Sequence, residues 1–424
     1  MSGSAQFTTY DRARIPSSLW KAWRHVRSKG LGSVSRQTRL EISEFDRHAE
    51  TKIASISRRL KRQTFQFQPA AGVAKKRSGK APRPIVIATV EARIVQRSIL
   101  NALREVPALD SFFHIPTSFG MVGVPPAIEK AYRMMQSGEG VYYIRSDIQG
   151  FFAQMPRSVP LTTIADVVPD EKLNGLLAAA MEVDLANAAN LGESLSLFPD
   201  DETGVAQGCA LSAFLGDVLL RDFDEKMNGR AITCLRYVDD FLLLGPSPST
   251  VSKAFTNAQD LLGKMNLRAY EPNVSPDKAA EGWTNKKWEF LGCEIIPGII
   301  RPSGKSKKRL LTKIEAMIRE NSASLHDPTS VRARRASLVE TLSDIDRLVR
   351  GWGNQYQYCN DAEGFATLEL EVGQRVDQLM NDCRAAAVRQ DGPEASRNRQ
   401  RIVGVHVLSD SKSDPITTRL QQEK

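Results

Sequence analysis

The sequence predicts an α+β fold in which helices surround an antiparallel sheet. Three apolar segments rich in β-branched and aromatic residues have the length and composition of strands. One of them contains a central acidic turn, which would fold it into a β-hairpin and make the sheet antiparallel. Most of the remaining chain repeats its apolar residues at helical intervals. The three strand segments are residues 141–147, 232–244 and 288–296.

The composition is that of a globular protein with a basic surface. The chain has 424 residues, enough for two or three subdomains, and its 41% hydrophobic and 25% charged residues are ordinary for a soluble protein. The net charge of +9 favours a polyanionic partner such as nucleic acid. Five dispersed cysteines without a CxxC pair argue against a disulfide framework or a zinc site and indicate a reducing compartment. The N-terminus has no apolar signal-peptide core, and no run of about 18 apolar residues occurs. We therefore expect a soluble, cytoplasmic protein without a membrane partner.

The first part of the chain predicts helices, a basic loop and a short strand. Residues 1–65 alternate apolar and basic positions at helical spacing, which indicates helices whose cationic face is either solvated or lies along phosphates. The segment KKRSGKAPR (75–83) has the composition of a basic, turn-rich loop, and PIVIA (84–88) that of a strand. A helix at 90–103 and a loop containing SFG (118–120) follow.

Helices are also expected around the predicted hairpin and after it. Residues 161–183 are mainly helical in pattern, residues 184–204 form a polar loop, and residues 204–227 begin with glycines and continue as an amphipathic helix. A further helix is expected at 251–267. After the basic patch RPSGKSKKR (301–309) the pattern is purely helical, and the polar residues at the end of the chain predict a loosely ordered tail.

The stretch RYVDDFLLLG (236–245) places two carboxylates side by side between apolar runs. An isolated Asp-Asp pair in a hairpin is explained by turn chemistry alone. Here the runs FLLL and VYYI lack the alternation of half-exposed strands, so both faces of these strands are expected to be covered. Acids at the ends of buried strands need a cationic partner. The flanking residues offer only Arg236 and Arg145.

A divalent metal ion is the simplest partner for these acids. Two Mg²⁺ ions about 3.5–4 Å apart can clamp the attacking and leaving oxygens of a phosphoryl transfer. Mg²⁺ binds through one or two carboxylates and substrate phosphates, and Mn²⁺ is an alternative ion. Such a site needs a third carboxylate from another strand. Asp147, at the end of VYYIRSD, is the candidate, because an adjacent strand could bring it beside Asp239.

The order of these segments resembles the palm of a reverse transcriptase. Four motifs carry the resemblance in the family's order: the first catalytic strand, the P-Q-G-x-x-x-S segment, the Y-x-D-D hairpin and the primer grip. They are DIQGFF (147–152), VAQGCALS (205–212), YVDD (237–240) and EFLG (289–292).

Flanking segments extend the resemblance to about residues 20–360. KAWRHVRSKG…FQFQPA, KKRSGKAPRPIVI, ARIVQRSI and SFG are similar to the fingers of bacterial group II intron-type and retron-type enzymes, and RLVRGWGNQYQYC resembles the G-W-x-x-Y-Y helix of group II-type thumbs. The resemblance implies a right-hand polymerase: fingers, a palm with a ferredoxin-like antiparallel sheet, and an α-helical thumb. The implied parts are an N-terminal helical extension (1–65), fingers (66–140), a palm with fingers insertion elements (141–300), a thumb (301–390) and a C-terminal tail (391–424).

The resemblance also implies roles at the catalytic site. Asp147 and Asp239 would bind metal, Asp240 would complete the metal-binding acidic cluster, and the peptide carbonyl of Ile148 could add a ligand. Phe152 stands where the family has its ribose gate, a bulky ring that clashes with a 2′-OH and favours dNTPs. By residue type alone Phe152 would be a core aromatic.

Further residues match positions that bind the incoming nucleotide. Arg83 matches the residue that grips the triphosphate, with Lys76 or Lys80 as its partner. Gln207 and Gly208 open the helix that would lie against the nascent base pair, where glycine permits close backbone approach.

Basic residues downstream match positions near pyrophosphate and nucleic acid. Lys278 falls where the family often has a lysine that can protonate the leaving pyrophosphate, although a surface lysine is an equal reading. The patch 301–309 lies where the thumb begins and would contact the template–primer backbone, unless it is a charged linker. The residues expected at nucleic acid are Lys305, Lys307, Lys308, Arg309 and Trp352.

Two departures from the family pattern bear on function. Ala206 replaces the usual proline before Gln-Gly, so nucleotide selection is expected to differ. No Cys/His-rich endonuclease module follows the thumb, which favours a stand-alone bacterial enzyme. We therefore expect an RNA-directed DNA polymerase of the retron or phage-defence kind, and favour the latter. Its partners would be dNTPs, an RNA template in the form of a dedicated noncoding RNA, and the DNA product.

Two alternatives remain open. The chain could be an RNA polymerase or a template-independent nucleotidyltransferase, although Phe152 argues against ribonucleotides. It could also be a non-catalytic, maturase-like RNA-binding protein, although three intact acids facing phosphates would not help pure binding.

Overall fold

The computed structural model describes residues 7–33, 35–77, 80–200, 202–229, 231–330 and 336–411. The chain divides into two units. Unit 1 comprises Met1–Leu291 and Ile295–Pro297, and unit 2 comprises Gly292–Glu294 and Gly298–Lys424. Each unit has its own hydrophobic core.

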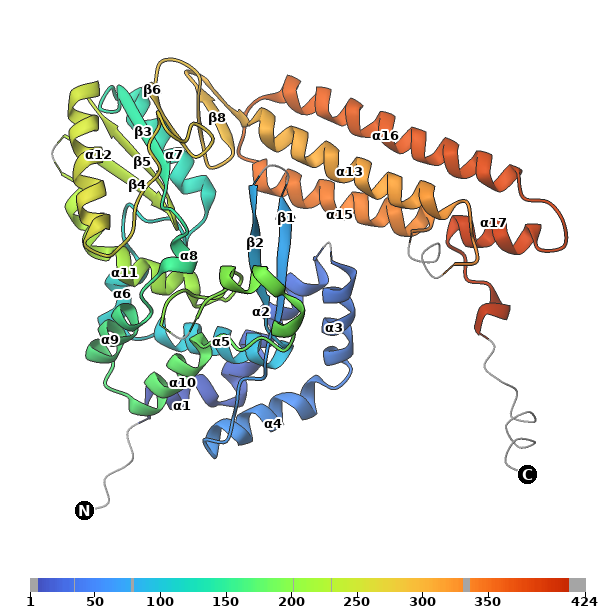
Figure 1. Ribbon diagram of the computed structural model, residues 1–424, viewed down its shortest axis with the longest axis horizontal. Helices are drawn as coiled ribbons and strands as arrows, with labels where there is room; N and C mark the ends of the chain where they lie inside the picture. Colours follow the sequence, from blue (N-terminus) through green and yellow to red (C-terminus); the bar gives the residue numbers. More distant parts are fainter. Residues whose placement is uncertain are drawn as a thin grey trace. The chain divides into compact units, whose positions relative to one another are not determined.

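The N-terminal helices of unit 1 pack around one apolar core. Leu19, Trp23, Ile42 and Ile53 from three successive helices are at most 1% exposed, and hydroxyl side chains cap several helix starts, as Thr8 does for the first. The basic residues that alternate with these apolar positions lie on the outer faces, as the periodicity predicts. The helices are α1 (Thr9–Arg14), α2 (Pro16–Leu31), α3 (Arg36–Asp46), α4 (Ala49–Lys61) and α5 (Val90–Leu103) (Figure 1).

A two-stranded antiparallel hairpin follows α4. It consists of β1 (Ala71–Arg77) and β2 (Lys80–Ile87). The predicted strand at 84–88 is thus confirmed and extended, whereas the turn-rich loop predicted for 75–83 is largely strand. Lys75 pairs with Arg83 across the hairpin. Basic side chains on so exposed a hairpin do not produce the apolar alternation by which strands are recognised.

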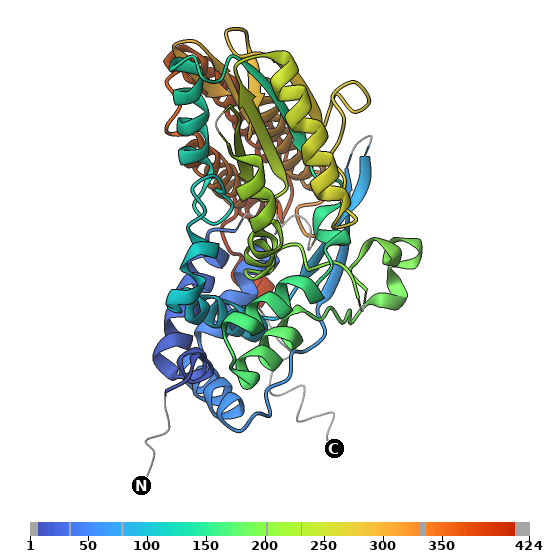
Figure 2. The same cartoon turned by 90° about the vertical axis from the view of Figure 1, so that its left-hand side faces the viewer.

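The central sheet of unit 1 has four antiparallel strands in the order β4-β5-β3-β6. With the helices α11 and α12 between its strands, the chain follows the β-α-β-β-α-β path of ferredoxin-like folds. α12 packs against β3, β5 and α11, and lies along the sheet in Figure 2. The elements are β3 (Tyr142–Asp147), α11 (Ser212–Met227), β4 (Thr233–Tyr237), β5 (Asp240–Gly245), α12 (Pro248–Gly263) and β6 (Ala279–Trp283).

The fourth strand of this sheet is not the one predicted from the sequence. The sequence predicted a third strand segment at 288–296 and none at 279–283, but it is β6 that pairs with β3. The sequence of β6, AAEGW, has no β-branched residue, and four of its five residues are Ala, Glu or Gly, so its strand signal is weak. The predicted segment forms β7 (Trp288–Phe290) and β8 (Cys293–Ile296), which make a separate sheet with β9 (Ile299–Pro302).

The other helices of unit 1 are short. The helical pattern at 161–183 is confirmed as two helices, and the polar loop after it contains 3₁₀ turns, η2 (Ala188–Asn190) and η3 (Gly192–Leu197). Another, η1 (Pro107–Leu109), precedes α6. The helices are α6 (Asp110–Phe113), α7 (Val124–Gln136), α8 (Phe151–Gln154), α9 (Ser158–Val167) and α10 (Glu171–Met181).

Unit 2 is helical apart from its strand segments, as the periodicity after residue 309 predicts. Leu310, Ile314, Ile345 and Leu379 are buried between its helices. Its last helix lies within the predicted tail. The elements are α13 (Gly304–Ser324), α15 (Leu338–Tyr356), α16 (Ala362–Val388), α17 (Ala395–Val403) and η4 (Leu408–Ser411). Within the described ranges of both units, no helix has the length and apolar character needed to cross a membrane.

Candidate active site

Asp147 and Asp240 face each other across adjacent strands. Asp147 is the last residue of β3, Asp240 is the first of β5, and the antiparallel ladder pairs them directly. Directly opposed residues point to the same face of a sheet. The backbone N–H of Ile148 donates to the carbonyl of Asp239 at 2.9 Å, which closes the ladder at this end. The sheet thus brings the three acids of the predicted site to one edge.

A two-residue loop, Val238 and Asp239, joins β4 to β5. Tyr237 pairs with Asp240, so only two residues connect the paired strands, as in the commonest tight hairpins. Val238 has a φ of +60°, which such turns require at their first position and which glycine normally supplies. A β-branched residue rarely adopts this conformation. The backbone is therefore strained immediately before the acidic pair.

The three carboxylates have strongly perturbed acidities. Burial raises the pKa of Asp240 to about 9, and the adjacent Asp147 adds to the effect. A hydrogen bond between the side chains of Asp240 and Asp147 accompanies this shift. Burial, then the charge of Asp147, raises the pKa of Asp239. Burial also opposes the charged form of Asp147, but hydrogen bonds with Asp240 and Lys278 bring its pKa below its usual value.

This donor set fits a cation that is completed by its substrate. Among the described residues, no three or more His, Cys, Asp or Glu side chains are arranged so that they alone could hold a metal ion. The site instead has two carboxyl groups in contact and a third beside them. The pKa values of Asp239 and Asp240 are raised, so the positive charges nearby do not fully offset the burial and mutual repulsion of these acids. Mg²⁺ binds through one or two carboxylates with substrate phosphates as further ligands. Asp147, Asp239 and Asp240 have the chemistry to supply those carboxylates, and their role as metal ligands stays a prediction.

Lys278 lies beside Asp147 on the side away from β5. Ser146 pairs with Ala279 between β3 and β6, so the next position on each strand places Lys278 next to Asp147. The Lys278 ammonium donates to Oδ2 of Asp147. Burial alone would lower the pKa of Lys278, but the hydrogen bond and charge of Asp147 raise it. The structure brings this predicted lysine into the acidic cluster.

Two predicted nucleotide-binding residues meet although they lie far apart in sequence. Nε of Arg83, on β2, donates to Oε1 of Gln207 at 2.5 Å. The positive charge of Arg83 is also close enough to favour the charged form of Asp239. The side chains of its predicted partners, Lys76 and Lys80, lie outside the part of the chain that the structure describes, although their backbones belong to the hairpin.

The segment before α11 turns sharply at Gly208, which has a φ of +109°. A Cβ atom there would stand 3.8 Å from the carbonyl oxygen of Val86, so the backbone conformation rather than crowding favours glycine. The carbonyl of Ala206, at the position where the family pattern has proline, accepts hydrogen bonds from the Cys209 N–H at 3.3 Å and the Ser212 hydroxyl at 2.8 Å. These bonds close the turn into the helix.

Phe152 lies in α8, half-buried against the core of unit 1. Gly150, with a φ of +55°, makes the turn that leads into this short helix. The carbonyl of Phe152 accepts a hydrogen bond from the Val205 N–H at 2.7 Å. The neighbouring Phe151 ring packs against Gly216 of α11, where a Cβ atom would come within 2.9 Å of it. The hydrogen bond from Val205 thus joins Phe152 to the segment that carries Gln207.

A comparison with protein families identifies the family to which this chain belongs. The reverse transcriptase (RNA-dependent DNA polymerase) family matches residues 73–295, more than half of the 424 residues. The chain belongs to this family. The right-hand polymerase fold and the enzyme class predicted from the sequence, RNA-directed DNA polymerase, are therefore confirmed. Reverse transcriptases generally use divalent metal ions, which agrees with the acidic donor set.

Individual similar proteins are distant. The protein YkfC of Escherichia coli strain K12 is 27% identical over 273 residues, which are 55% of this chain and 68% of YkfC. The apo telomerase of Candida tropicalis has a TM-score of 0.43 at 13% identity, covering 80% of this chain and 68% of that one. For the same telomerase truncated from its C-terminal domain the values are 0.37 and 14%, and this chain spans about half, 54%, of its length. A chain of a partial Cas6-RT-Cas1–Cas2 complex has a TM-score of 0.36 at 17% identity, covering 61% of this chain and 41% of that one.

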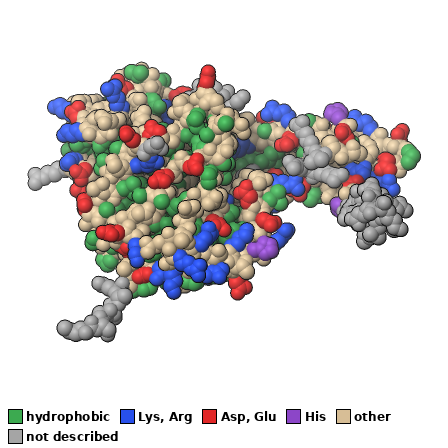
Figure 3. All heavy atoms as spheres, turned by 60° about the horizontal axis from the view of Figure 1, so that its bottom comes forward, with side chains coloured by type: hydrophobic (Ala, Val, Ile, Leu, Met, Phe, Trp, Pro, Cys, Tyr) green, Lys and Arg blue, Asp and Glu red, His purple; other side chains and the backbone are tan. Residues whose placement is uncertain are grey.

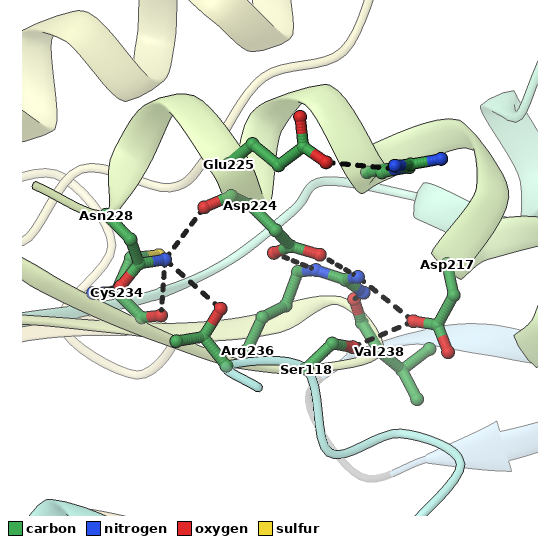
Figure 4. Close-up of polar contacts among 10 residues, drawn as sticks. Ser118, Asp217, Asp224, Glu225, Asn228, Cys234, Arg236 and Val238 are labelled. Carbon is green, nitrogen blue, oxygen red and sulfur yellow. Dashed lines mark hydrogen bonds and ion pairs between the residues drawn. The ribbon is translucent and has the colours of Figure 1, made fainter. Parts of the chain in front are cut away.

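One buried arginine of this reverse transcriptase has partners other than the acids with which the sequence analysis matched it. Arg236 was a possible counter-ion for the strand-end acids, but it is fully buried and pairs with two acids of α11. Its Nε donates to Oδ1 of Asp224 at 2.8 Å and its Nη2 to Oδ1 of Asp217 at 2.9 Å. Its Nη1 donates to the carbonyl of Val238 at 2.9 Å, and the Ser118 hydroxyl completes the network by donating to Asp217 (Figure 4).

A signal for these partners does exist in the sequence. Asp217 and Asp224 stand seven residues apart on a helix that is otherwise apolar on its inner side, so they share one face. Burial alone would lower the pKa of Arg236, but the two carboxylates raise it. The guanidinium therefore remains charged inside the core.

The predicted nucleic-acid residues of the thumb lie around the start of α13. Lys305, Lys308 and Arg309 are exposed, whereas Lys307 is half-buried and pairs with Asp361 at 3.6 Å. Trp352, on α15, is packed rather than free: its indole N–H donates to the Ser306 hydroxyl at 3.0 Å, and its ring lies 4.8 Å from that of Tyr356. Its role at nucleic acid stays a prediction.

Proposed function

We propose that this reverse transcriptase extends a DNA strand with dNTPs on an RNA template by two-metal phosphoryl transfer at Asp147, Asp239 and Asp240. The observation that carries the proposal is the backbone register that sets Asp147 opposite Asp240, with Asp239 bonded to Ile148 beside them. Two Mg²⁺ ions, when bound there, supply the Lewis-acid chemistry that activates the attacking oxygen and stabilises the leaving group.

The protein's own residues bind and orient the reactants. The primer 3′-oxygen forms a bond to the α-phosphorus of the dNTP, and the bond to the β-phosphate breaks to release pyrophosphate. Arg83 presents a guanidinium fork, suited to bidentate contact with the triphosphate, and its bond to Gln207 holds it beside the segment that faces the base pair. Phe152 excludes a 2′-OH at the sugar.

Lys278 has a double role in this proposal. In the free enzyme its ammonium neutralises Asp147. In the ternary complex it is placed to give a proton to the leaving pyrophosphate, after metal and substrate have displaced it from the carboxylate. Positioning and charge neutralisation then account for most of the rate.

The exposed Lys305, Lys308 and Arg309 at the start of α13 are proposed to contact the template–primer backbone. A second basic surface lies over the N-terminal helices of unit 1, where Figure 3 shows Lys and Arg side chains gathered on the face turned toward the viewer. Arg24, Lys29, Arg58 and Lys61 are exposed on α2 and α4. Such surfaces bind phosphates without reading sequence, and the binding weakens with salt.

We further propose that the template is a dedicated noncoding RNA and that the product serves antiviral defence in a bacterial cytoplasm. Three features support this: the likeness of the fingers segments to group II-type and retron-type enzymes, the basic face of α2 and α4, and five free thiols, which suit a reducing compartment.

Primer extension tests the proposed chemistry. Purified protein is given an RNA template, a DNA primer, labelled dNTPs and Mg²⁺, and Asp239→Ala is compared with Asp222→Ala, a control acid on the exposed side of α11. We expect extension by the parent and the control, and none by Asp239→Ala or after removal of Mg²⁺ with chelator. Equal activity of Asp239→Ala would refute the assignment.

The same assay separates the alternatives. Incorporation of rNTPs at the rate of dNTPs would identify an RNA polymerase, and incorporation without template an untemplated transferase. RNA binding without any incorporation would identify a binding protein. Sequencing the RNA that copurifies with the chain, and plating phage on cells with the parent or Asp239→Ala, tests the template and the defence role. A heterogeneous RNA pool would contradict the former, and equal plating the latter.

A further inference from the structure

The turn that carries Asp239 and Asp240 is held in an unfavourable backbone conformation. Val238 adopts a φ of +60°, a region that β-branched residues rarely enter. Strained conformations of this kind persist only where the contacts of the surrounding structure hold them in place. The contacts of the turn therefore show what holds it.

Two contacts converge on Val238. Nη1 of Arg236 donates to the Val238 carbonyl at 2.9 Å, and Gly120 lies so close that a Cβ atom there would stand 2.9 Å from Cγ2 of Val238. The loop that carries Gly120 is itself bound to Arg236. The Arg236 N–H donates to the Thr117 carbonyl, and the Phe119 N–H donates to the Arg236 carbonyl, both at 2.8 Å.

Arg236 also joins this turn to α11. Asp217 and Asp224 bind its guanidinium from one side of that helix, which begins four residues after Gly208 in the segment proposed to face the base pair. The guanidinium and both carboxyl groups are buried, and the desolvation of buried ion pairs offsets most of their Coulombic gain. Stability alone is therefore a weak reason for this network (Figure 4).

We propose that Arg236 is a positioning residue that holds the Tyr237–Asp240 turn against α11 and so sets Asp240 opposite Asp147, with Asp239 beside them. The proposal rests on the proposed function of the three acids. In this proposal Arg236 maintains the geometry of the metal-binding edge. It does not bind dNTP or nucleic acid. Its loss should therefore lower kcat and metal affinity while the KM for dNTP stays nearly constant.

Three variants test this. Arg236→Lys keeps the charge between the two acids, but a single ammonium cannot reach three acceptors as the planar guanidinium fork does. Arg236→Lys/Val238→Gly adds a residue that adopts positive φ without cost, so the turn no longer needs to be held. Arg157→Lys is the matched control, since Arg157 is 6% exposed and donates to the carbonyls of Met181 and Asp200 in the same unit.

The readouts are kcat and KM for dNTP in primer extension, and the affinity for Mn²⁺ without nucleotide, followed by the loss of the free-ion EPR signal. We expect Arg236→Lys to lower kcat and Mn²⁺ affinity about tenfold or more, the usual cost of losing an outer-shell partner. Val238→Gly should recover a large part of both, and the control should change neither. Losses equal to those of Arg157→Lys, or losses that Val238→Gly does not reverse, would overturn the proposal.

Two further outcomes remain informative. If the parent binds Mn²⁺ but polymerises nothing, the proposed function fails, and the Mn²⁺ titrations still decide the role of Arg236. If Arg236→Lys does not fold, Gly120→Ala replaces it, because the added methyl group would crowd Val238 without unpairing a charge. Unchanged kcat and Mn²⁺ affinity in Gly120→Ala would then overturn the proposal.

Discussion

Replacing Lys278 with methionine should have opposite effects on metal binding and on catalysis. In the free enzyme the Lys278 ammonium occupies Oδ2 of Asp147, so a metal ion must displace it. Methionine keeps much of the side-chain volume and removes the charge. Metal binding to the free enzyme should therefore become tighter, whereas nucleotide addition should become slower because the proposed proton donor is lost.

The size of the first effect follows from the exposure of the pair. The Lys278 side chain is 35% exposed, so solvent screens the ion pair and its contribution is about 1 kcal/mol. Since about 1.4 kcal/mol corresponds to tenfold, the Mn²⁺ dissociation constant should fall about fivefold. Loss of a general acid typically costs about 10²-fold or more in rate, so kcat should fall by at least that factor.

Titration with Mn²⁺ by EPR, without nucleotide, measures the first effect, and single-turnover primer extension the second. Lys226→Met is the matched control, because Lys226 forms an exposed ion pair with Asp222 on α11. Unchanged or weaker Mn²⁺ binding in Lys278→Met would refute the competition between lysine and metal. A kcat equal to that of the parent would refute its role as proton donor.

Other substitutions probe the remaining residues of the site. Phe152→Val should admit rNTPs, and unchanged sugar selectivity in competition assays would contradict the gate. Arg83→Lys loses the fork that binds Gln207, so the KM for dNTP should rise about tenfold with little change in kcat; a changed kcat at constant KM would contradict this. The double variant Lys305→Gln/Lys308→Gln should bind a template–primer duplex with a weaker salt dependence. The slope of log affinity against log salt concentration should fall by about 0.9 for each duplex phosphate that is no longer neutralised. An unchanged slope would show that both lysines face solvent in the complex.

The edge that carries Asp147, Asp239 and Asp240 was predictable because its signals are local. Asp147 and the pair Asp239 and Asp240 each end an apolar strand segment, so the strand pattern and the acids point to the same place. The hairpin turn was predictable for the same reason. What the sequence could not show was that Asp240 rather than Asp239 stands directly opposite Asp147, because register depends on turn geometry as well as on pattern.

The missed features depend on tertiary structure. Lys278 could be placed only loosely because β6, the strand that it precedes, has a weak strand signal, whereas the segment at 288–296 carries a stronger strand pattern. Arg236 was matched with the nearest acids in sequence, whereas its partners are two acids of α11. Hydrogen bonds such as that between Arg83 and Gln207 join segments whose approach no local pattern records.

Insertions and deletions should be tolerated poorly in the paired strands β3, β5 and β6 and well in the loop at 184–204. Side chains alternate between the faces of a strand, so removing one residue within Tyr142–Asp147 would turn the carboxylate of Asp147 to the opposite face or break its pairing with Asp240 and Lys278. The polar stretch at 184–204, which contains only short 3₁₀ turns, has no such constraint. Lineages of this enzyme should therefore differ in the length of that stretch while every one of them keeps the spacing within the three strands.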